Sequence, residues 1–353
     1  MRIALISLYL PSESKIGSGY QAHYMANAFT QRGHGVTVFS PCERPEDARY
    51  EHVRVAVGEV GRTFRFAWNL RRVDWSRFDV VHAHGDDYWL WGHNKPVHVR
   101  TMHGSCFAEA ANVPAMKEKL RMVMLGISEV IATAAADRTV CVSRDTRRYY
   151  PWVKDVIVDG VDLSAFHPGP VKENEPTILF VGTYENRKRG KLLMEAFGAV
   201  IRPALPTAQL WMVCGDAPLA AGVTTFGRIT TERLADLYRR AWVFCLPSSY
   251  EGFGVPYIEA MASGTAVVAT PNPGALEVLD GGRFGKIVEP DQIGAAILEL
   301  LNNAPPRDSM AAAGLKRAQE YSWDRVLSEY ERIYTEVAAE RQKMGRRVRS
   351  AWT

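Results

Sequence analysis

Two glutamates, Glu251 and Glu259, flank a glycine-bearing loop whose pattern is suited to binding a phosphate and the hydroxyl groups beside it. The loop follows an apolar strand that we expect to end at Pro247, and it leads into a helix that we expect to end at Gly264. Backbone N–H groups and the positive end of the helix dipole converge at such a helix start. Glu259, about one turn into the helix, would accept hydrogen bonds from ribose hydroxyls, and Glu251 would meet a sugar joined to the phosphate. The alternative is that both acids merely stabilise the first turns of a helix.

A second glycine-bearing stretch, Gly17-Ser18-Gly19, follows the first predicted strand and precedes a helix. It resembles a loop that lets a phosphate approach the backbone, although Ala22 breaks the full G-x-G-x-x-G spacing. No acidic residue ends the second predicted strand at 36–40. Both departures argue against a dinucleotide cofactor.

Histidine and acidic residues gather after the predicted strand at 80–84. Because side chains two positions apart on a strand share a face, His82 and His84 could face one ligand, and with Asp86 and Asp87 they could suggest a metal. The alternative is an acceptor-binding surface, since aromatic and polar groups together suit stacking on a sugar and hydrogen bonding to it. We assign to this acceptor side Tyr20, His84, Asp86, Asp87, Tyr88 and Trp89.

The elements that must position these residues alternate along the whole chain, as short β-branched runs and amphipathic stretches of helix length. In the first half we expect strands at 2–8, 36–40, 53–57, 80–84, 97–101 and 139–142, with helices around 20–32 and 116–134. In the second half we expect strands near 177–182, 210–214, 243–247, 266–270 and 286–288, then helices at 307–320 and 323–341. This pattern predicts an α/β protein with parallel sheets covered by helices on both faces.

A stretch rich in proline and charge, residues 168–176, separates two similar halves. We therefore predict two Rossmann-like, doubly wound domains facing a cleft, at 1–168 and 169–322. Residues 323–353 would form a C-terminal helix that could return to the first domain, with a basic tail. Ligands of open parallel sheets bind beyond the carboxyl ends of the strands, so the loops of both domains would surround one substrate.

Composition excludes several classes of protein. With 47% hydrophobic and 23% charged residues in 353, the chain is an ordinary globular protein rather than a disordered one. A formal net charge of +4 is too small to indicate a dedicated nucleic-acid binder. The five scattered cysteines lack CxxC spacing and predict a reducing compartment. The apolar N-terminus is too short to span a bilayer and is interpreted as a first strand, so we expect a cytoplasmic protein.

The segment 248–264 matches the E-x7-E motif of the family 4 retaining glycosyltransferases, which have the GT-B fold. Other motifs resemble that family in the same order along nearly the whole chain. They are Gly17-Ser18-Gly19, Thr101-Met102-His103-Gly104, Asp159-Gly160-Val161-Asp162, Val181-Gly182-Thr183, Gly227 before Thr231-Glu232-Arg233-Leu234, and Ser322-Trp323 with Tyr334. The second domain is the stronger match, and the resemblance implies that it binds the nucleotide sugar while the first domain holds the acceptor side.

The resemblance also implies roles for single residues. Glu251 would bind the donor sugar hydroxyls, Lys188 the diphosphate, and His103 the donor sugar near C6; these three are the candidate catalytic residues. A cationic cluster around Lys188 suits a departing diphosphate, which gathers negative charge, although an exposed basic loop is the alternative. The donor-binding residues would be Gly17, Ser18, Gly19, Thr183, Arg187, Arg189, Gly252, Phe253, Gly254, Val255 and Glu259.

Two positions depart from the family pattern. Thr183 stands where many members carry an arginine, so one phosphate contact is either missing or supplied by Arg187 or Arg189. Asp159 replaces the usual asparagine of the Asn-Gly-Val-Asp motif. Neither departure breaks the E-x7-E segment.

The expected activity is retaining transfer of a hexose-type sugar from a nucleotide sugar, with UDP favoured and GDP the alternative, to a hydroxyl acceptor. The acceptor would be a carbohydrate, a lipid-linked glycan or a small molecule, and we expect no nucleic-acid partner, cofactor or required metal. Peripheral membrane contact could come from the basic tail at 341–349. The alternatives are a sugar-phosphate phosphorylase, a nucleotide-sugar epimerase, or a non-catalytic nucleotide-sugar sensor.

Overall fold

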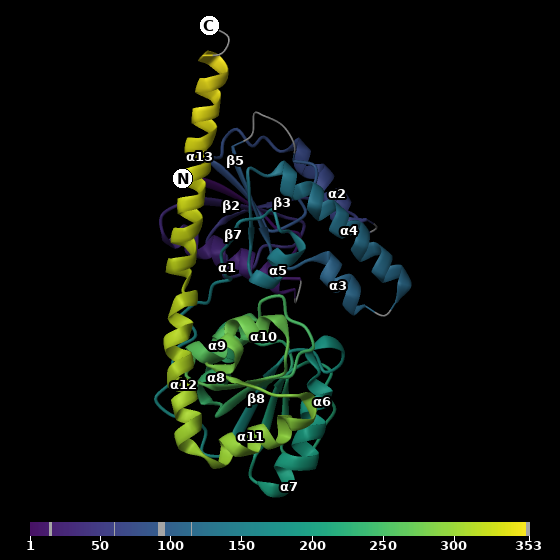
Figure 1. The fold of residues 1–353 in the computed structure, drawn as a ribbon, viewed down its shortest axis with the longest axis vertical. Coiled ribbons are helices and arrows are strands. Elements are labelled where there is room, and N and C mark those ends of the chain that lie inside the picture. The colour runs from purple at the N-terminus through teal and green to yellow at the C-terminus, as the bar shows by residue number, and fades with distance from the viewer. Residues whose placement is uncertain (14–15, 60, 91–95, 114, 351–353) are drawn as a thin grey trace. The chain divides into compact units, whose positions relative to one another are not determined.

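The computed structural model describes residues 1–13, 16–59, 61–90, 96–113 and 115–350, without the side chains of Asn112 and 344–350. The basic tail expected at 341–349 therefore lies largely outside the described side chains. The chain forms two compact units, shown in Figure 1. Unit 1 comprises Met1–Asp159 and the stretch that begins at Trp323, and unit 2 comprises Gly160–Ser322. The sequence-based boundary, after residue 168, lies further along the same connecting stretch.

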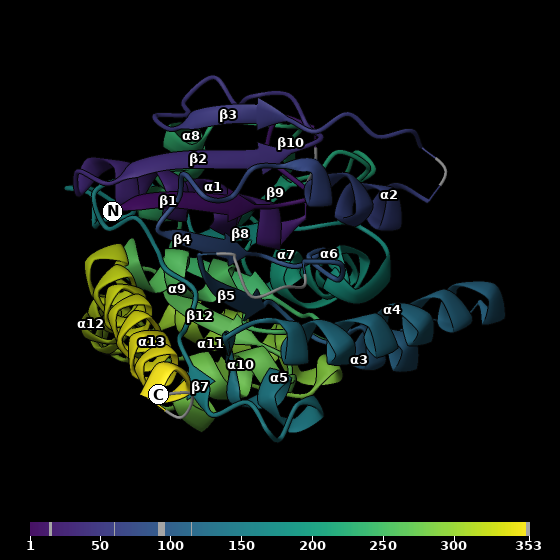
Figure 2. The same cartoon turned by 90° about the horizontal axis from the view of Figure 1, so that it is seen from above.

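Unit 1 contains a seven-stranded parallel sheet in the order β3-β2-β1-β4-β5-β6-β7. Figure 2 shows β3, β2, β1 and β4 side by side in this order. The strands are β1 (Arg2–Ile6), β2 (Gly35–Ser40), β3 (Glu51–Arg54), β4 (Val80–Ala83), β5 (Val97–Met102), β6 (Arg138–Cys141) and β7 (Asp155–Val156). The helices are α1 (Gly17–Gln31), α2 (Arg62–Asn69), α3 (Cys106–Asn112), α4 (Met116–Ala135), α5 (Arg144–Tyr149) and α13 (Trp323–Ser350).

The alternation of side chains along β1 builds a core on each face of this sheet. Ile3 and Leu5 pack in a cluster with α1 and α13, and Ala4 and Ile6 pack in a cluster that includes Phe66 of α2. The C-terminal helix α13, yellow in Figure 1, belongs to unit 1 because its buried side chains recur every three or four residues on one face.

Unit 2 contains a six-stranded parallel sheet in the order β10-β9-β8-β11-β12-β13. Its strands are β8 (Thr177–Val181), β9 (Gln209–Val213), β10 (Val223–Phe226), β11 (Val243–Leu246), β12 (Ala266–Ala269) and β13 (Lys286–Ile287). Its helices are α6 (Gly190–Ala196), α7 (Arg202–Ala204), α8 (Thr231–Arg240), α9 (Val255–Ala262), α10 (Pro273–Val278), α11 (Ile293–Asn302) and α12 (Ala304–Ala318). In both sheets the strand order reverses beside the first strand, β1 or β8, which is the doubly wound arrangement.

The predicted α/β fold with two Rossmann-like units is confirmed, and the differences concern short edge strands. The sequence analysis did not predict β10, because Val223–Phe226 is half-exposed and lacks the apolar run of a buried strand. It also missed the two-residue strand β7. No helix within the described residues is long and apolar enough to cross a membrane.

Candidate active site

The loop after β11 is held in a shape that fixes the start of α9. Gly254 caps this helix with φ of 101°, and a Cβ at this position would lie 2.6 Å from the ring of Tyr257. The Tyr257 hydroxyl donates to the carbonyl oxygen of Leu246 at 3.2 Å, which ties the helix to the strand before it. Asn272 Nδ2 donates to the carbonyl oxygen of Ser248 at 3.2 Å from the other side. Glycine is therefore required at position 254 both by conformation and by space.

Glu251 lies buried in this loop between two basic side chains. Its Oε1 is 2.7 Å from Lys188 Nζ, and its Oε2 is 3.0 Å from a terminal guanidinium nitrogen of Arg187. Burial alone would raise the pKa of Glu251, but these two cations bring its pKa below the ordinary value. Glu251 is therefore an ionised carboxylate at neutral pH, and each of its oxygens can accept hydrogen bonds.

Lys188 is placed by the turn that follows β8. A Cβ at Gly182 would lie 3.1 Å from Lys188 Cβ, so the absence of a side chain at Gly182 leaves room for the lysine stem. The Ser249 amide donates to the carbonyl oxygen of Arg187 at 2.8 Å and joins this turn to the loop after β11. Burial lowers the pKa of Lys188, and the Glu251 carboxylate opposes that shift. The carboxyl ends of two neighbouring strands thus supply the opposite charges of this site.

Glu259 lies on α9 and accepts a hydrogen bond from the Tyr238 hydroxyl of α8 at 3.0 Å. Burial raises the pKa of Glu259 to about 7, while Tyr238 and the positive charge of Lys188 act to lower it. Lys188 therefore interacts electrostatically with both glutamates of the motif. The structure brings Glu251, Glu259, Lys188 and Arg187 into one site in unit 2.

The other predicted donor-side residues of unit 2 frame this cluster. The Thr183 hydroxyl donates to the carbonyl oxygen of Glu185 at 2.9 Å, and Arg189, with φ of 54°, leads into α6. Gly252 precedes the buried Phe253, whose ring lies 5.8 Å from that of Tyr321. Val255 is the first residue of α9. A donor-binding role for these residues stays a prediction.

A stack of histidines lies at the carboxyl ends of β4 and β5 in unit 1. His84 Nδ1 and His103 Nε2 are 2.7 Å apart, and the two rings lie 5.0 Å apart at 19°. His103 Nδ1 is 3.3 Å from Oδ1 of Asp159. His82, one step further into the sheet, bonds the Tyr334 hydroxyl at 2.7 Å. Burial lowers the pKa of both His82 and His84, so these two rings are neutral at physiological pH.

The acidic residues after β4 have separate environments. Asp87 is fully buried, contacts the Arg100 guanidinium and bonds His98 Nε2 at 2.8 Å. Asp86 has φ of 62°, accepts a hydrogen bond from the Tyr88 hydroxyl at 3.4 Å, and has a pKa that burial raises to about 7. Within the part of the chain that the structure describes, no group of three or more His, Cys, Asp and Glu side chains is arranged to hold a metal ion.

The first glycine-bearing stretch opens α1 in unit 1. A Cβ at Gly19 would lie 2.7 Å from the backbone oxygen of Tyr9, so close backbone packing accounts for this glycine. Gly17 has open space around its Cβ position, and Ser18 follows it in the first turn. The Tyr20 ring lies 6.1 Å from that of Tyr24 on the same helix. A donor-binding role for this stretch stays a prediction.

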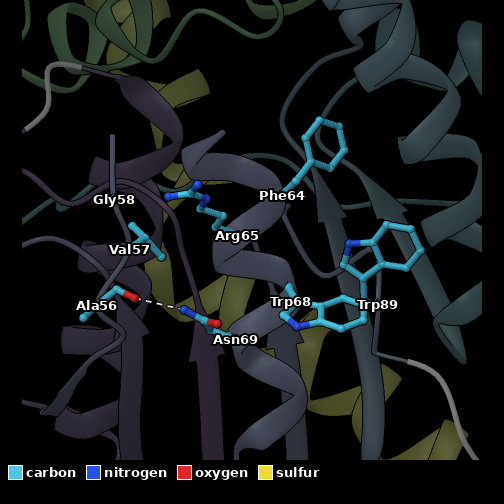
Figure 3. Close-up of a pocket in the computed structure, with 8 residues that line it drawn as sticks. All are labelled: Ala56, Val57, Gly58, Phe64, Arg65, Trp68, Asn69 and Trp89. Atoms are coloured by element: carbon cyan, nitrogen blue, oxygen red, sulfur yellow. Dashed lines mark hydrogen bonds between the residues drawn. The ribbon is translucent and has the colours of Figure 1, made fainter. Parts of the chain in front are cut away.

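An aromatic pocket of about 460 Å³ opens beside α2 in unit 1. Figure 3 shows Arg65 and Asn69 of α2 pointing toward residues 56–58 and Trp68 of the same helix beside Trp89, while the Phe64 ring points away from them. The rings of Trp68 and Trp89 meet edge to face with centroids 6.4 Å apart. Asn69 Nδ2 donates to the carbonyl oxygen of Ala56 at 3.0 Å. Flat apolar rings beside amide and guanidinium groups suit a ligand that presents both C–H faces and hydroxyls.

Sequence reasoning missed three participants in these clusters. Tyr238 bonds Glu259 across two helices, and no local pattern links the two positions. Asp159 was noticed as a departure from the family motif, but its contact with His103 depends on the fold. Trp68 was not singled out, although half of it is exposed on a helix whose opposite face is buried.

Two family models match the chain, each over one part. Residues 17–164 match the model described as Glycosyltransferase Family 4, and residues 175–303 match the model described as Glycosyl transferases group 1. The chain is 31% identical to a D-inositol 3-phosphate glycosyltransferase of Geodermatophilus obscurus over 330 residues, which cover 78% of this chain and 71% of that protein.

A phosphatidyl-myo-inositol mannosyltransferase of Mycobacterium tuberculosis is 32% identical over 210 residues, covering 53% of this chain and 55% of that protein. The chain thus spans about half the length of the first curated relatives that it matches. Among solved structures, a sucrose-phosphate synthase from Thermosynechococcus elongatus has the same fold, with a TM-score of 0.78 at 22% identity, covering 96% of this chain and 99% of that one.

Proposed function

The chain belongs to glycosyltransferase family 4, and on that premise we propose that it transfers a hexose-type sugar from a nucleotide sugar to a hydroxyl acceptor, with retention of the anomeric configuration. We propose UDP as the donor nucleotide, with GDP as the alternative. The observation that carries this proposal is the buried Glu251 carboxylate between Lys188 and Arg187. A buried acid with two cations beside a helix start provides groups for both parts of a sugar diphosphate.

Each group of the site has a role in this proposal. The diphosphate binds Lys188 and Arg187 and lies toward the positive end of α9, because anions are stabilised by cations and by a helix N-terminus. The diphosphate competes with Glu251 for Lys188 and Arg187, so the carboxylate oxygens become available to the sugar. The sugar hydroxyls then donate to the ionised Glu251. Glu259 binds the ribose hydroxyls beside the Tyr238 hydroxyl.

The reaction forms a bond between the acceptor oxygen and the anomeric carbon and breaks the bond from that carbon to the diphosphate. The leaving diphosphate takes the acceptor proton on the same face, so a protein nucleophile is not needed. Lys188 and Arg187 stabilise the charge that develops on the leaving group. These cations supply the role that a divalent metal has in other transferases, and we propose that none is required.

The acceptor side of the proposal rests on unit 1. The relatives named above act, by their names, on inositol-containing acceptors. The aromatic pocket beside α2, with Trp68, Trp89 and Asn69, suits a polyhydroxylated acceptor of this chemical kind, whether a free carbohydrate, a lipid-linked glycan or a small molecule. His103, held by Asp159, is proposed to contact the donor sugar.

The five cysteines are all free, in keeping with a cytoplasmic protein.

The test is thermal stabilisation by nucleoside diphosphates and nucleotide sugars, with and without magnesium, because a ligand that binds the folded state raises the unfolding midpoint. We expect the nucleotides of one base to raise the midpoint most, both with and without magnesium. In the wild type the nucleotide sugar should raise the midpoint more than its nucleoside diphosphate does, and Glu251→Gln should lose this difference. Absence of a shift with every nucleotide would contradict the donor site.

Product analysis separates the rival activities. Isomerised donor in the absence of any acceptor would indicate an epimerase, and sugar phosphate formed from inorganic phosphate would indicate a phosphorylase. Binding without turnover against polyol, glycan and lipid acceptors would indicate a sensor. Transfer that yields the same anomeric configuration as the donor supports the proposal.

A further inference from the structure

One face of α4 carries a row of large apolar side chains that unit 1 leaves exposed. Because they recur every three or four residues, they form one stripe along the helix, which we call the α4 stripe. Its members are Met116, Leu120, Met124, Ile127 and Ile131. Their exposed fractions fall from 77% at Met116 to 43% at Ile131. The N-terminal end of the helix therefore projects furthest from unit 1.

The opposite side of α4 fixes the direction in which the stripe points. A Cβ at Gly126 would lie 2.8 Å from the Phe107 ring of α3, so the two helices pack closely. Glu129 accepts hydrogen bonds from the Cys106 amide at 3.0 Å and from the Tyr150 hydroxyl at 2.5 Å. Leu125 is buried on this side. Rotation of α4 to hide the stripe would break these contacts, so the exposure is a fixed property of the fold.

The charges beside the stripe are positive. At about 100° per residue, Lys117 and Lys119 lie on opposite flanks of the stripe, and both are exposed. Glu118 is paired with Arg121 of the same helix, with Arg121 Nε 3.0 Å from its carboxylate. Figure 2 shows α4 extending outward from the unit 1 sheet. A projecting helix with an apolar face between lysines has the pattern of helices that lie in a membrane interface.

We propose that the α4 stripe seats unit 1 on an anionic lipid surface, with the five apolar side chains in the acyl boundary and Lys117 and Lys119 at the headgroups. A second copy of this chain paired in parallel through the stripe would bring the flanking lysines of both copies together, whereas anionic headgroups attract them. The inference goes beyond the proposed glycosyl transfer and does not depend on it. It also differs from the expectation of contact through the basic tail, because it rests on described side chains.

The test measures binding of the full chain to vesicles by flotation. We expect binding to vesicles of phosphatidylcholine and phosphatidylglycerol in equal amounts, and much weaker binding to phosphatidylcholine alone. The double variant Leu120→Gln, Ile127→Gln should lower the partition coefficient by about tenfold or more, because each change removes an inserted apolar side chain. The matched control is Leu219→Gln in unit 2, at a leucine that is 92% exposed, and it should bind as the wild type does.

A second pair of variants tests the charge. Lys117→Glu with Lys119→Glu should weaken binding to the anionic vesicles, and raising the salt concentration should weaken wild-type binding. Unchanged thermal midpoints, and unchanged thermal shifts with nucleoside diphosphate, would show that the variants stay folded. Wild-type protein that does not float with anionic vesicles would overturn the proposal. So would equal binding to neutral vesicles, or a dimer in light scattering that only the stripe variant dissociates.

Discussion

The carboxylate of Asp159 lies 3.3 Å from Nδ1 of His103, at the residue where unit 1 gives way to unit 2. His84 holds the other ring nitrogen of His103 at 2.7 Å, so the imidazole is fixed from both sides. The family motif that the sequence resembles has asparagine where this chain has Asp159. The contact is electrostatic, because the two atoms lie 3.3 Å apart without hydrogen-bond geometry.

This contact predicts unequal effects of two substitutions at Asp159. Asp159→Asn should keep turnover within about threefold of the wild type, because the amide keeps a polar oxygen beside Nδ1 of His103. Asp159→Ala should lower turnover by about tenfold or more, because His103 loses its fixed orientation. Steady-state transfer rates at saturating donor would measure both. Asp162→Asn, in an exposed turn, is the control, and wild-type turnover in Asp159→Ala would remove Asp159 from the site.

Removing the Lys188 ammonium should affect both the reaction and the stability of the chain. Lys188→Ala should lower turnover by about 100-fold, since the leaving diphosphate loses a charge partner. It should also lower the free energy of unfolding by about 1–3 kcal/mol, because Glu251 stays buried with Arg187 as its nearest cation.

The matched control is Lys191→Ala, which removes the same charge from an exposed position on α6. Urea unfolding and single-turnover kinetics would be measured on both variants. If Lys188→Ala turned over at the rate of Lys191→Ala, the diphosphate role would pass to Arg187 or Arg189.

The sequence predicted the repeating βα pattern and the donor motif because both are local. Apolar runs such as Val243–Leu246 and the spacing of Glu251 and Glu259 can be seen without a fold. The resemblance assigned both Glu251 and Lys188 to the donor, but their ion pair was not predicted, because it depends on β8 and β11 being neighbours. Contacts between distant elements, such as Tyr238 with Glu259, had no signal in the spacing.

The α4 stripe shows why a helix could be predicted while its function could not. Residues 116–134 were expected to be helical, but an apolar face normally indicates burial in the core. Here the helix has apolar residues on two sides: Leu125, Gly126 and Ala132 are buried against the unit, while the residues of the α4 stripe face outward. The side that is exposed is determined by packing against Phe107 and by the hydrogen bonds of Glu129, which depend on the fold.

Gly254→Ala should disorganise the start of α9. The new methyl group would meet the Tyr257 ring, and φ of 101° is strained for alanine, so we expect a loss of about 1–3 kcal/mol in stability. Nucleoside diphosphate affinity should fall as well. Gly198→Ala is the control, because its Cβ would have open space, and it should leave both quantities near wild type. Calorimetric titration and urea unfolding would measure them, and unchanged binding in Gly254→Ala would mean that this turn does not hold the phosphate.

The raised pKa of Glu259 predicts a pH dependence of stability. Burial moves the pKa of this carboxyl from 4.5 to about 7 in the folded chain, so between these values the folded state holds more protons than the unfolded state. Stability from this group is therefore fully present at low pH and is lost as pH rises from about 4.5 to about 7, a change of about 1–3 kcal/mol. Asp86, whose pKa burial also raises to about 7, adds a slope of the same sign. Glu259→Gln, which stays neutral at this position, should therefore reduce the slope without abolishing it, whereas Glu232→Gln, exposed on α8, should leave it unchanged. Urea unfolding at pH 5 and pH 8 would measure the difference, and equal slopes in wild type and Glu259→Gln would show that Glu259 is ionised across the range.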